Sequence, residues 1–118
     1  CPNCKEKYPA TEVDTAFIKR QYGEAYIEEL NLPETIMLYR GKGCDECGNT
    51  GYRGRTGVHE LLAMTAELRA LVYKEASVHE MKAQAMKDGM RTLTQDGILK
   101  VLKGDTDIAQ VQIISGLA

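Results

Sequence analysis

The sequence predicts an α+β fold, in which a small tetracysteine subdomain with a short sheet is followed by a mostly helical C-terminal subdomain. All four cysteines fall into two Cys-x-x-Cys pairs within the first 47 residues. Strand character is confined to two short runs, residues 36–39 and 58–64. From residue 65 onward, apolar residues recur at helical spacing between capping residues. We therefore expect residues 1–56 to form the metal-binding insert, and residues 57–118 to form a returning strand and helices.

The composition limits the class of protein. A chain of 118 residues fits one domain, or one domain with a small satellite. The hydrophobic share of 43% and the charged share of 27% exclude a disordered chain and a collagen-like chain. A net charge of −2 disfavours a protein that acts mainly on nucleic acid. No apolar run approaches the roughly 18 residues of a membrane span, so membrane insertion is not expected.

The first forty residues are expected to form a turn, a helix and a strand. Residues 1–10 contain a Cys-Pro-x-Cys knuckle and a second proline, which is typical of a turn. Apolar residues at roughly helical spacing predict a helix within residues 12–30, broken or kinked at Gly23. Residues 36–39 then form a short strand candidate.

A glycine-rich loop separates this region from the next strand candidate. Residues 41–57 contain six of the eleven glycines, so the backbone is expected to turn tightly several times. Residues 58–64 carry apolar side chains on both faces of an extended chain. This pattern predicts a mostly buried strand.

The remainder of the chain predicts four helices with short connections, which favours a compact bundle. The signals that delimit these helices are Thr65 and Ser77 as N-terminal caps, Gly89 and Gly104 as ends, and Asp105 or Thr106 as the last cap. Apolar residues on the inner faces of the predicted elements give a candidate core. It comprises Phe17, Ile27, Leu38, Val58, Leu62, Leu68, Leu71, Met81, Leu93, Ile98, Val101 and Ile108.

The four cysteines are the strongest chemical signal in the sequence. Zinc favours four soft ligands in a tetrahedron, and structural sites often consist of two such Cys-x-x-Cys knuckles. No cysteine is left over, and the knuckles lie in loops rather than between a strand and a helix. We therefore expect a structural Zn²⁺ ion at four ligands, which are Cys1, Cys4, Cys44 and Cys47. A redox-active pair and a disulfide framework remain alternative interpretations.

The chain shows no catalytic machinery. It contains no Ser/His/Asp set, no carboxylate pair with a plausible pocket and no phosphate-binding loop with its lysine. His59 is interpreted as a packed or hydrogen-bonded residue of the predicted strand, with a role at an interface as the alternative, and His79 as a surface residue. No catalytic or cofactor-binding residue is therefore predicted.

Two groups of charges flank the second knuckle in the sequence. The segment Glu24–Glu34 lies in a stretch with four glutamates and neither Lys nor Arg, which is typical of a solvated acidic face. A basic group comprises Arg40, Lys42, Arg53 and Arg55. It is interpreted as a solvated rim, with contact to a phosphate or an acidic partner as the alternative.

Two longer motifs give the chain a family resemblance. The first is Cys44-x-x-Cys47-x-x-Thr50-Gly51-Tyr52-x-Gly54-Arg55-x-Gly57-Val58-x-Glu60-Leu61, preceded by Cys1-Pro2-x-Cys4. The second is Gly89-Met90-Arg91-Thr92-Leu93, followed by Asp96-Gly97-x-x-Lys100-Val101-x-x-Gly104-x-Thr106. In this order, they resemble the metal-binding insert and C-terminal helices of GspE/PilB-type secretion ATPases, the motors of type II secretion and type IV pilus assembly.

The resemblance implies a role as well as a fold. Family members are hexameric RecA-like ATPases whose ATP and Mg²⁺ sites lie upstream of the first cysteine, so this chain would be a non-catalytic tail that begins after them. Its strand at residues 57–62 would return towards the ATPase core. The implied partners are that core, neighbouring subunits and the cytoplasmic part of an inner-membrane platform protein. The implied location is the cytoplasmic face of the inner membrane.

Two other functions compete with this interpretation. A zinc-ribbon-like nucleic-acid module would use the basic group as its footprint, although the acidic pI of about 5.7 argues against it. A thiol oxidoreductase or chaperone-like zinc module is suggested by the second cysteine pair alone.

Overall fold

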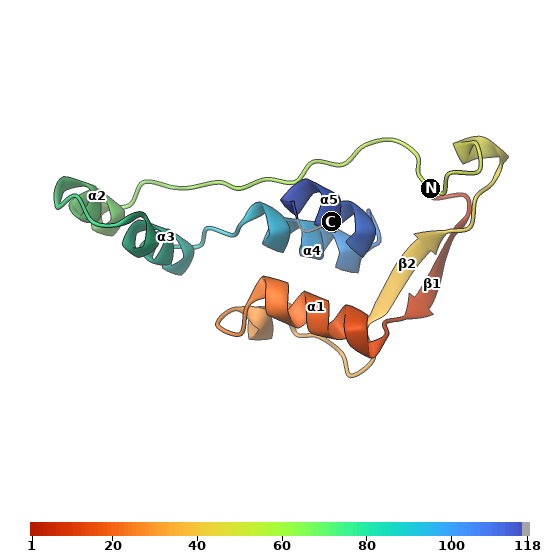
Figure 1. The fold of residues 1–118 in the computed structure, drawn as a ribbon, viewed down its shortest axis with the longest axis horizontal. Coiled ribbons are helices and arrows are strands. Elements are labelled where there is room, and N and C mark those ends of the chain that lie inside the picture. Colours follow the sequence, from red (N-terminus) through yellow and green to blue (C-terminus); the bar gives the residue numbers. More distant parts are fainter. Residues whose placement is uncertain (117–118) are drawn as a thin grey trace. The chain divides into compact units, whose positions relative to one another are not determined.

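The computed structural model describes residues 1–116, and these form two compact units (Figure 1). The first unit contains residues 1–58 together with the chain from Thr94 onward. The second unit contains residues 59–93. The predicted domain boundary between residues 56 and 57 stays a prediction.

A two-stranded antiparallel sheet begins the first unit, and we call it the β1–β2 hairpin although a helix lies between its strands in the chain. Strand β1 (Lys5–Pro9) pairs with β2 (Met37–Gly41), with Lys5 opposite Gly41 and Pro9 opposite Met37. The sequence predicted β2, but the interpretation of residues 1–10 as a turn was wrong. Only residues 1–4 turn. The sequence did not reveal β1, because its pairing partners lie 28 to 36 residues further along the chain and leave no local signature.

Helix α1 (Glu12–Tyr22) and a short 3₁₀ helix, η1 (Ile27–Leu30), lie between the two strands in the chain. The helix begins at a capping box, in which the Thr11 hydroxyl accepts from the Asp14 amide and the Asp14 carboxylate accepts from the Thr11 amide, both at 3.1 Å. It ends at Gly23, whose φ of +96° suits glycine. The predicted helix with a break at Gly23 is therefore confirmed.

The core of the first unit joins the hairpin and α1 to the two C-terminal helices, α4 (Leu93–Lys103) and α5 (Ile108–Ser115). The buried members of this core are Ile18, Tyr22, Ile36, Leu38, Ile98, Val101 and Val111. One buried polar side chain lies beside it: the Gln95 amide donates to the Tyr22 carbonyl at 2.6 Å. This bond ties α4 to the end of α1.

The second unit is a pair of short helices, α2 (Ala66–Tyr73) and α3 (Val78–Lys87). Their N-terminal caps are Thr65 and Ser77, as predicted. A small core of Leu68, Ala85 and Met90 lies between them. The four C-terminal helices therefore do not form one bundle, because α4 and α5 belong to the core of the first unit.

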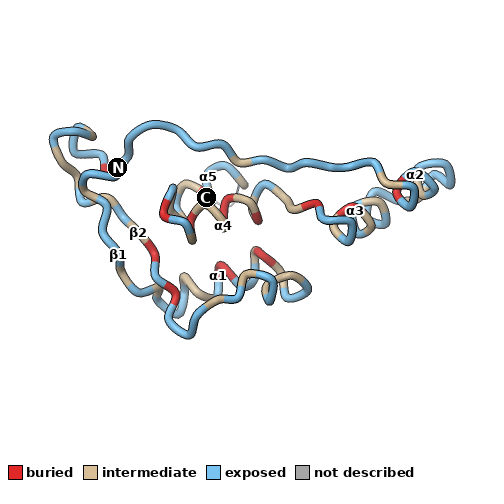
Figure 2. Tube along the Cα trace, turned by 180° about the vertical axis from the view of Figure 1, so that it is seen from behind, coloured by how far each residue is buried: buried red, intermediate tan, exposed pale blue. Residues whose placement is uncertain are grey.

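The strand predicted over residues 58–64 is wrong for this structure. Within the described residues 1–116, this segment belongs to neither a helix nor a strand, and it runs as an exposed connection (Figure 2). Leu61 and Leu62 are 81% and 47% exposed. The apolar pattern suits a strand, but a strand needs a hydrogen-bonding neighbour, and none pairs with this segment.

The remaining expectations can be compared element by element. Of the predicted core residues, Phe17, Leu38, Leu68, Ile98 and Val101 are buried, whereas Ile27, Val58, Leu71, Met81 and Ile108 are partly buried and Leu62 and Leu93 are exposed. The cap of α5 is Asp107 rather than Asp105 or Thr106, and its carboxylate accepts from the Gln110 amide at 2.9 Å. Among residues 1–116, no helix combines the length and the hydropathy needed to cross a membrane.

Candidate metal centre

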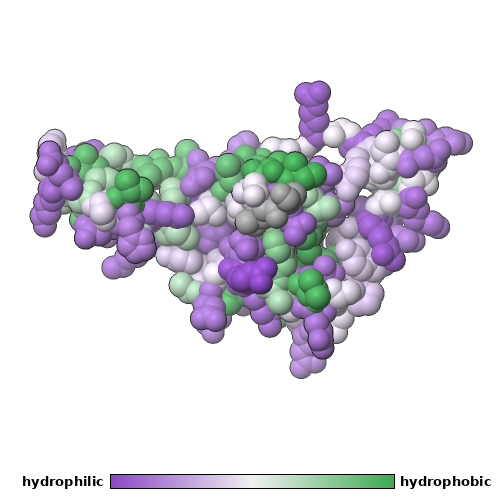
Figure 3. Space-filling model, in the orientation of Figure 1, coloured by the Kyte–Doolittle hydropathy of each residue, from purple (hydrophilic) through white to green (hydrophobic). Residues whose placement is uncertain are grey.

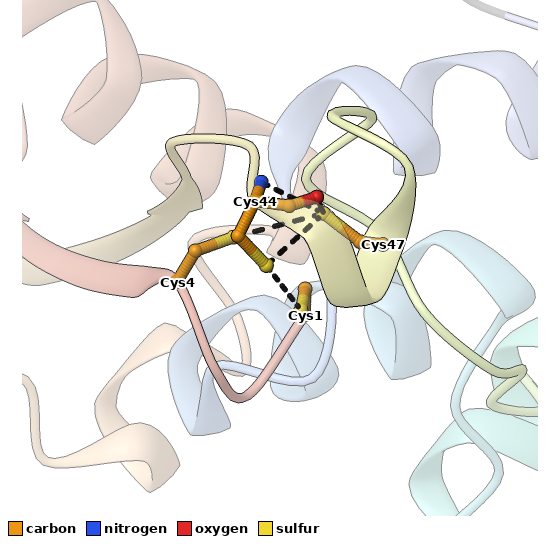
Figure 4. A group of neighbouring side chains, drawn as sticks. All are labelled: Cys1, Cys4, Cys44 and Cys47. Carbon is orange, nitrogen blue, oxygen red and sulfur yellow. Dashed lines mark hydrogen bonds between the residues drawn. The ribbon is translucent and has the colours of Figure 1, made fainter.

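The four cysteine sulfurs converge at the end of the β1–β2 hairpin (Figure 4). All four Sγ atoms lie within 4.8 Å of one another, and each cysteine is partly buried. Among the described residues, neither histidine nor any carboxylate belongs to this cluster. The structure therefore brings together the four residues that the sequence singled out.

Three of the sulfur spacings match the edges of a tetrahedron, and the others lie within 4.8 Å. With a Zn–S distance of about 2.3 Å, tetrahedral geometry places neighbouring sulfurs about 3.8 Å apart. The Sγ–Sγ distances are 3.8 Å for Cys1–Cys44, 3.9 Å for Cys4–Cys47 and 3.6 Å for Cys44–Cys47. The donor set fits a closed zinc site, which has no free coordination position for a catalytic water.

Local backbone turns present the sulfurs within each pair. In the first knuckle, the amides of Cys4 and Lys5 both donate to the Cys1 carbonyl, at 3.3 and 2.9 Å. The second knuckle is the 3₁₀ helix η2 (Asp45–Cys47), which ends at Gly48 in the left-handed conformation with φ +61°. Each turn is short enough to direct two side chains to the same side.

The hairpin brings the two knuckles together. Beyond the last ladder pair, the Lys42 amide donates to the Cys4 carbonyl at 3.2 Å, and the Cys1 nitrogen donates to the Gly51 carbonyl at 2.7 Å. The backbones of Gly41 and Gly51 touch: a Cβ on Gly41 would lie 2.2 Å from the Gly51 oxygen. Glycine at position 41 is required by this close approach rather than by its own φ angle.

Backbone and amide donors surround the sulfurs. The amides of Gly51 and Cys44 donate to the Cys47 sulfur at 3.2 and 3.3 Å, and the Asn3 side-chain amide donates to the Cys44 sulfur at 3.3 Å. Sequence reasoning did not identify Asn3 or Gly51 as donors, although their positions inside and just after the knuckles were the available signal. Such outer contacts orient metal ligands and stabilise thiolates.

The same contacts separate the acidities of two cysteines. Burial raises the pKa of Cys47, but the Gly51 and Cys44 amides outweigh it and hold that pKa at about 6. At Cys4, burial is the largest influence and raises the pKa, and the neighbouring Cys44 and Cys47 sulfurs act in the same direction. A thiolate at Cys47 near neutral pH is the protonation state that a metal requires.

The sulfurs are not joined as disulfides. All four cysteines are free, and the closest measured pair is separated by 3.6 Å against about 2.05 Å for a disulfide bond. A coordinated metal requires this free-thiol arrangement.

The predicted basic group lies on the surface. Arg53 pairs with Glu46 at 3.1 Å and Arg40 with Glu6 at 3.8 Å, and all four of these side chains are well exposed. Exposed pairs of this kind contribute about 0–1 kcal/mol each. His59 and His79 are exposed residues of the second unit. His79 is therefore the predicted surface residue, and His59 is not packed within a strand.

Comparison with known proteins agrees with the fold and the cysteine cluster. A closed tetracysteine knuckle on a small α+β unit defines a class of structural metal-binding domains. The family model described as "Type II/IV secretion system protein" matches residues 1–113. The chain belongs to this family.

Three curated relatives illustrate the similarity. The chain is 38% identical to the type II secretion system protein E of Pseudomonas aeruginosa over 94% of its own length and 20% of the relative's. It is 34% identical to the type II secretion system ATPase E of Vibrio cholerae, over 98% of the chain and 21% of the relative. It is 45% identical to the type IV pilus assembly ATPase PilB of Thermus thermophilus, over 63% of the chain and 8% of the relative. The chain thus spans about a fifth or less of the length of these relatives.

Proposed function

We propose that this chain is the non-catalytic C-terminal part of a hexameric secretion-system or pilus-assembly ATPase, ordered by a structural zinc ion. Cys1, Cys4, Cys44 and Cys47 would hold the zinc. The observation that carries the proposal is the set of sulfur spacings, which match the edges of a tetrahedral thiolate site. ATP and Mg²⁺ would bind only in the upstream core of the longer protein.

The physical role of the zinc is to order loops that lack a core of their own. When bound, the ion supplies a fixed tie between thiolates and no reactive position. The second knuckle and its flanks are rich in glycine, and residues 41–50 include no buried side chain. Without a tie, the conformational entropy of these loops opposes a single arrangement. With the tie, the hairpin and both knuckles become a rigid body that can transmit force.

The partners follow from the family and the names of the relatives. The proposed contacts are the ATPase core, neighbouring subunits and the cytoplasmic part of a platform protein in the inner membrane. The proposed location is accordingly cytoplasmic, at the inner-membrane face. Support comes from relatives that are named as type II secretion and type IV pilus assembly ATPases.

The first test measures metal content and thiol reactivity. Chain purified under reducing conditions without chelator should carry one zinc per molecule, and its four thiols should react with a thiol reagent only after chelation. Cys44→Ser should lose the metal, whereas Cys44→His should retain part of it because imidazole is also a zinc ligand. If the chain purified in this way contains no metal and its thiols react before any chelator is added, the proposal is contradicted.

The second test concerns the longer protein. Replacing both Cys44 and Cys47 by serine in the full-length ATPase should impair secretion or piliation, because the loops that carry force would no longer be ordered. Normal secretion or piliation by a folded, zinc-free subunit would disprove the proposed role.

A further inference from the structure

A groove of about 760 Å³ opens on the first unit beside the first knuckle, and Cys1 and Pro2 are among its lining residues. It is lined by the loop that follows the second knuckle, by the turn after α4 and by one face of α5. All lining residues belong to the first unit. The proposed structural zinc gives this groove no role, so its chemistry needs its own explanation.

One part of the groove is aliphatic. Val58, Val111 and Ile114 line it, and the last two come from α5. Helix α5 contains no charged residue, and a helix that is apolar on several sides is ordinarily covered. Val111 is fully buried, yet Ile113 and Ile114 remain 61% and 49% exposed. Figure 3 shows apolar residues at the surface over this helix.

The other part of the groove is mainly basic. Lys5, Arg53 and Arg55 line it, and Asp105 contributes one acidic group. The Lys5 ammonium donates to the Gly104 carbonyl at 3.2 Å, and Arg53 is paired with Glu46. Arg55 is exposed and forms no ion pair or hydrogen bond within residues 1–116. The guanidinium of Arg55 is therefore available to a carboxylate.

We infer that this groove is a docking site for an acidic peptide segment that carries branched apolar side chains and belongs to a partner protein. Aliphatic residues of the segment would cover Val58 and Ile114, and its carboxylates would face Arg55 and Arg53. Complementary charge at the rim selects the partner, while the apolar contacts supply most of the affinity.

A nucleic acid fits the same groove less well. Tyr52 is the aromatic side chain among the described lining residues, and its hydroxyl is hydrogen-bonded to the Asp107 carboxylate. Binding of single-stranded nucleic acid relies on several aromatic side chains on which bases stack, and on a continuous positively charged surface. This groove offers aliphatic side chains in place of further aromatic ones, and Asp105 interrupts its positive charge.

The test uses fluorescence anisotropy with the zinc-loaded chain. The probe is a labelled twelve-residue peptide with glutamates and leucines at helical spacing, and the control peptide replaces each glutamate by lysine. The acidic probe should bind, its affinity should fall as salt rises, and the lysine control should bind at least about tenfold more weakly. This readout does not depend on secretion, so its failure would leave the proposed zinc-ordered module untouched.

Two matched pairs of variants locate the binding. Arg55→Glu should weaken the probe about fivefold, whereas Arg20→Glu, an equal charge reversal on the exposed side of α1, should leave its affinity unchanged. Ile114→Ala should weaken it about tenfold, whereas Ile113→Ala, at the more exposed neighbour outside the groove, should not. Circular dichroism of each variant confirms that the fold is retained.

Several outcomes would overturn the inference. Equal losses within either pair of variants would show that the groove is not the binding site. Tighter binding of a single-stranded oligonucleotide than of the acidic peptide, lost in Arg55→Glu, would assign the groove to nucleic acid instead. Self-association of the chain that Arg55→Glu abolishes would assign the groove to a second copy.

Discussion

The two compact units differ in what holds them together. The first unit has a buried core drawn from a hairpin and three helices, and it also contains the four converging cysteines. The second unit has two short helices around three buried side chains, and it contains no cysteine. Chains of fewer than roughly 40 residues seldom fold alone without a metal, a disulfide or a partner surface. The second unit is below that size.

Exposed apolar side chains point to the same difference. Much of the large apolar surface of the second unit and its leading segment is open to solvent, at Leu61, Leu62, Met64, Val72, Tyr73 and Val78. A unit with so little internal core gains stability from contact with other protein surface. The first unit is stabilised by its own core, to which the proposed zinc would add, whereas the second depends on what it packs against.

Removing zinc should produce the largest difference in stability between the two units. At free zinc about a thousandfold above its Kd, a bound ion stabilises the folded state by about 4 kcal/mol. A strong chelator should therefore abolish hydrogen-exchange protection in β1 and β2, while α2 and α3 keep the protection they had. Mass spectrometry of exchanged peptides from each unit measures both regions in one experiment.

Acid should reproduce the effect of the chelator. Thiolate ligands have a lowered pKa in the zinc-bound state, so their stabilisation is present at higher pH and is lost as pH falls through that pKa. Equal loss of protection in both units would show that the metal stabilises the whole chain and would remove the distinction between them.

Truncating one core residue in each unit should give the next largest loss of stability. Ile98→Ala and Leu68→Ala each remove a fully buried aliphatic side chain, at a cost of about 2–5 kcal/mol. Ile98→Ala should lower the thermal midpoint of the first unit. Leu68→Ala should abolish protection in α2 and α3 and leave the hairpin unchanged. Loss of hairpin protection in Leu68→Ala would mean that the units unfold together.

A pair of glycine substitutions tests the knuckle geometry at a smaller scale. Gly41→Ala would place a methyl group 2.2 Å from the Gly51 oxygen, and the two knuckles must separate to accept it. We expect a cost of about 2–3 kcal/mol and a corresponding loss of zinc affinity. In the control Gly48→Ala, no atom lies within 4 Å and only the positive φ of +61° opposes the change, at about 1 kcal/mol. Competition titration with a zinc indicator compares the two.

The sequence allowed prediction of elements with local signals. Thr65, Ser77 and Gly104 were identified because caps and ends depend on neighbouring residues. The four cysteines were identified as one cluster because two knuckles together complete a tetrahedral set. These inferences require only a few consecutive residues and a known coordination number.

Features that depend on distant residues were missed or wrong. β1 could not be predicted, since its alternation is weak and its partner β2 lies far along the chain. The division of the helices between units depends on whether α4 packs on α1 or on α3, and the apolar stripe of α4 suits either. The exposed segment at residues 58–64 has the composition of a buried strand, because composition does not show whether a pairing strand is available.

The smallest expected change in stability comes from removing one helix cap in each unit. Thr65→Ala removes the oxygen that accepts from the Leu68 amide at 3.1 Å and also the bond to the Asp88 carboxylate at 2.6 Å. Thr11→Ala removes the equivalent cap of α1. Each change costs about 1 kcal/mol, which is a small part of the stability of the first unit but a large part of that of the second. Hydrogen exchange should therefore show α2 opening measurably in Thr65→Ala, while α1 changes little in Thr11→Ala. If both helices lose protection equally, the second unit is as stable as the first and needs no partner surface.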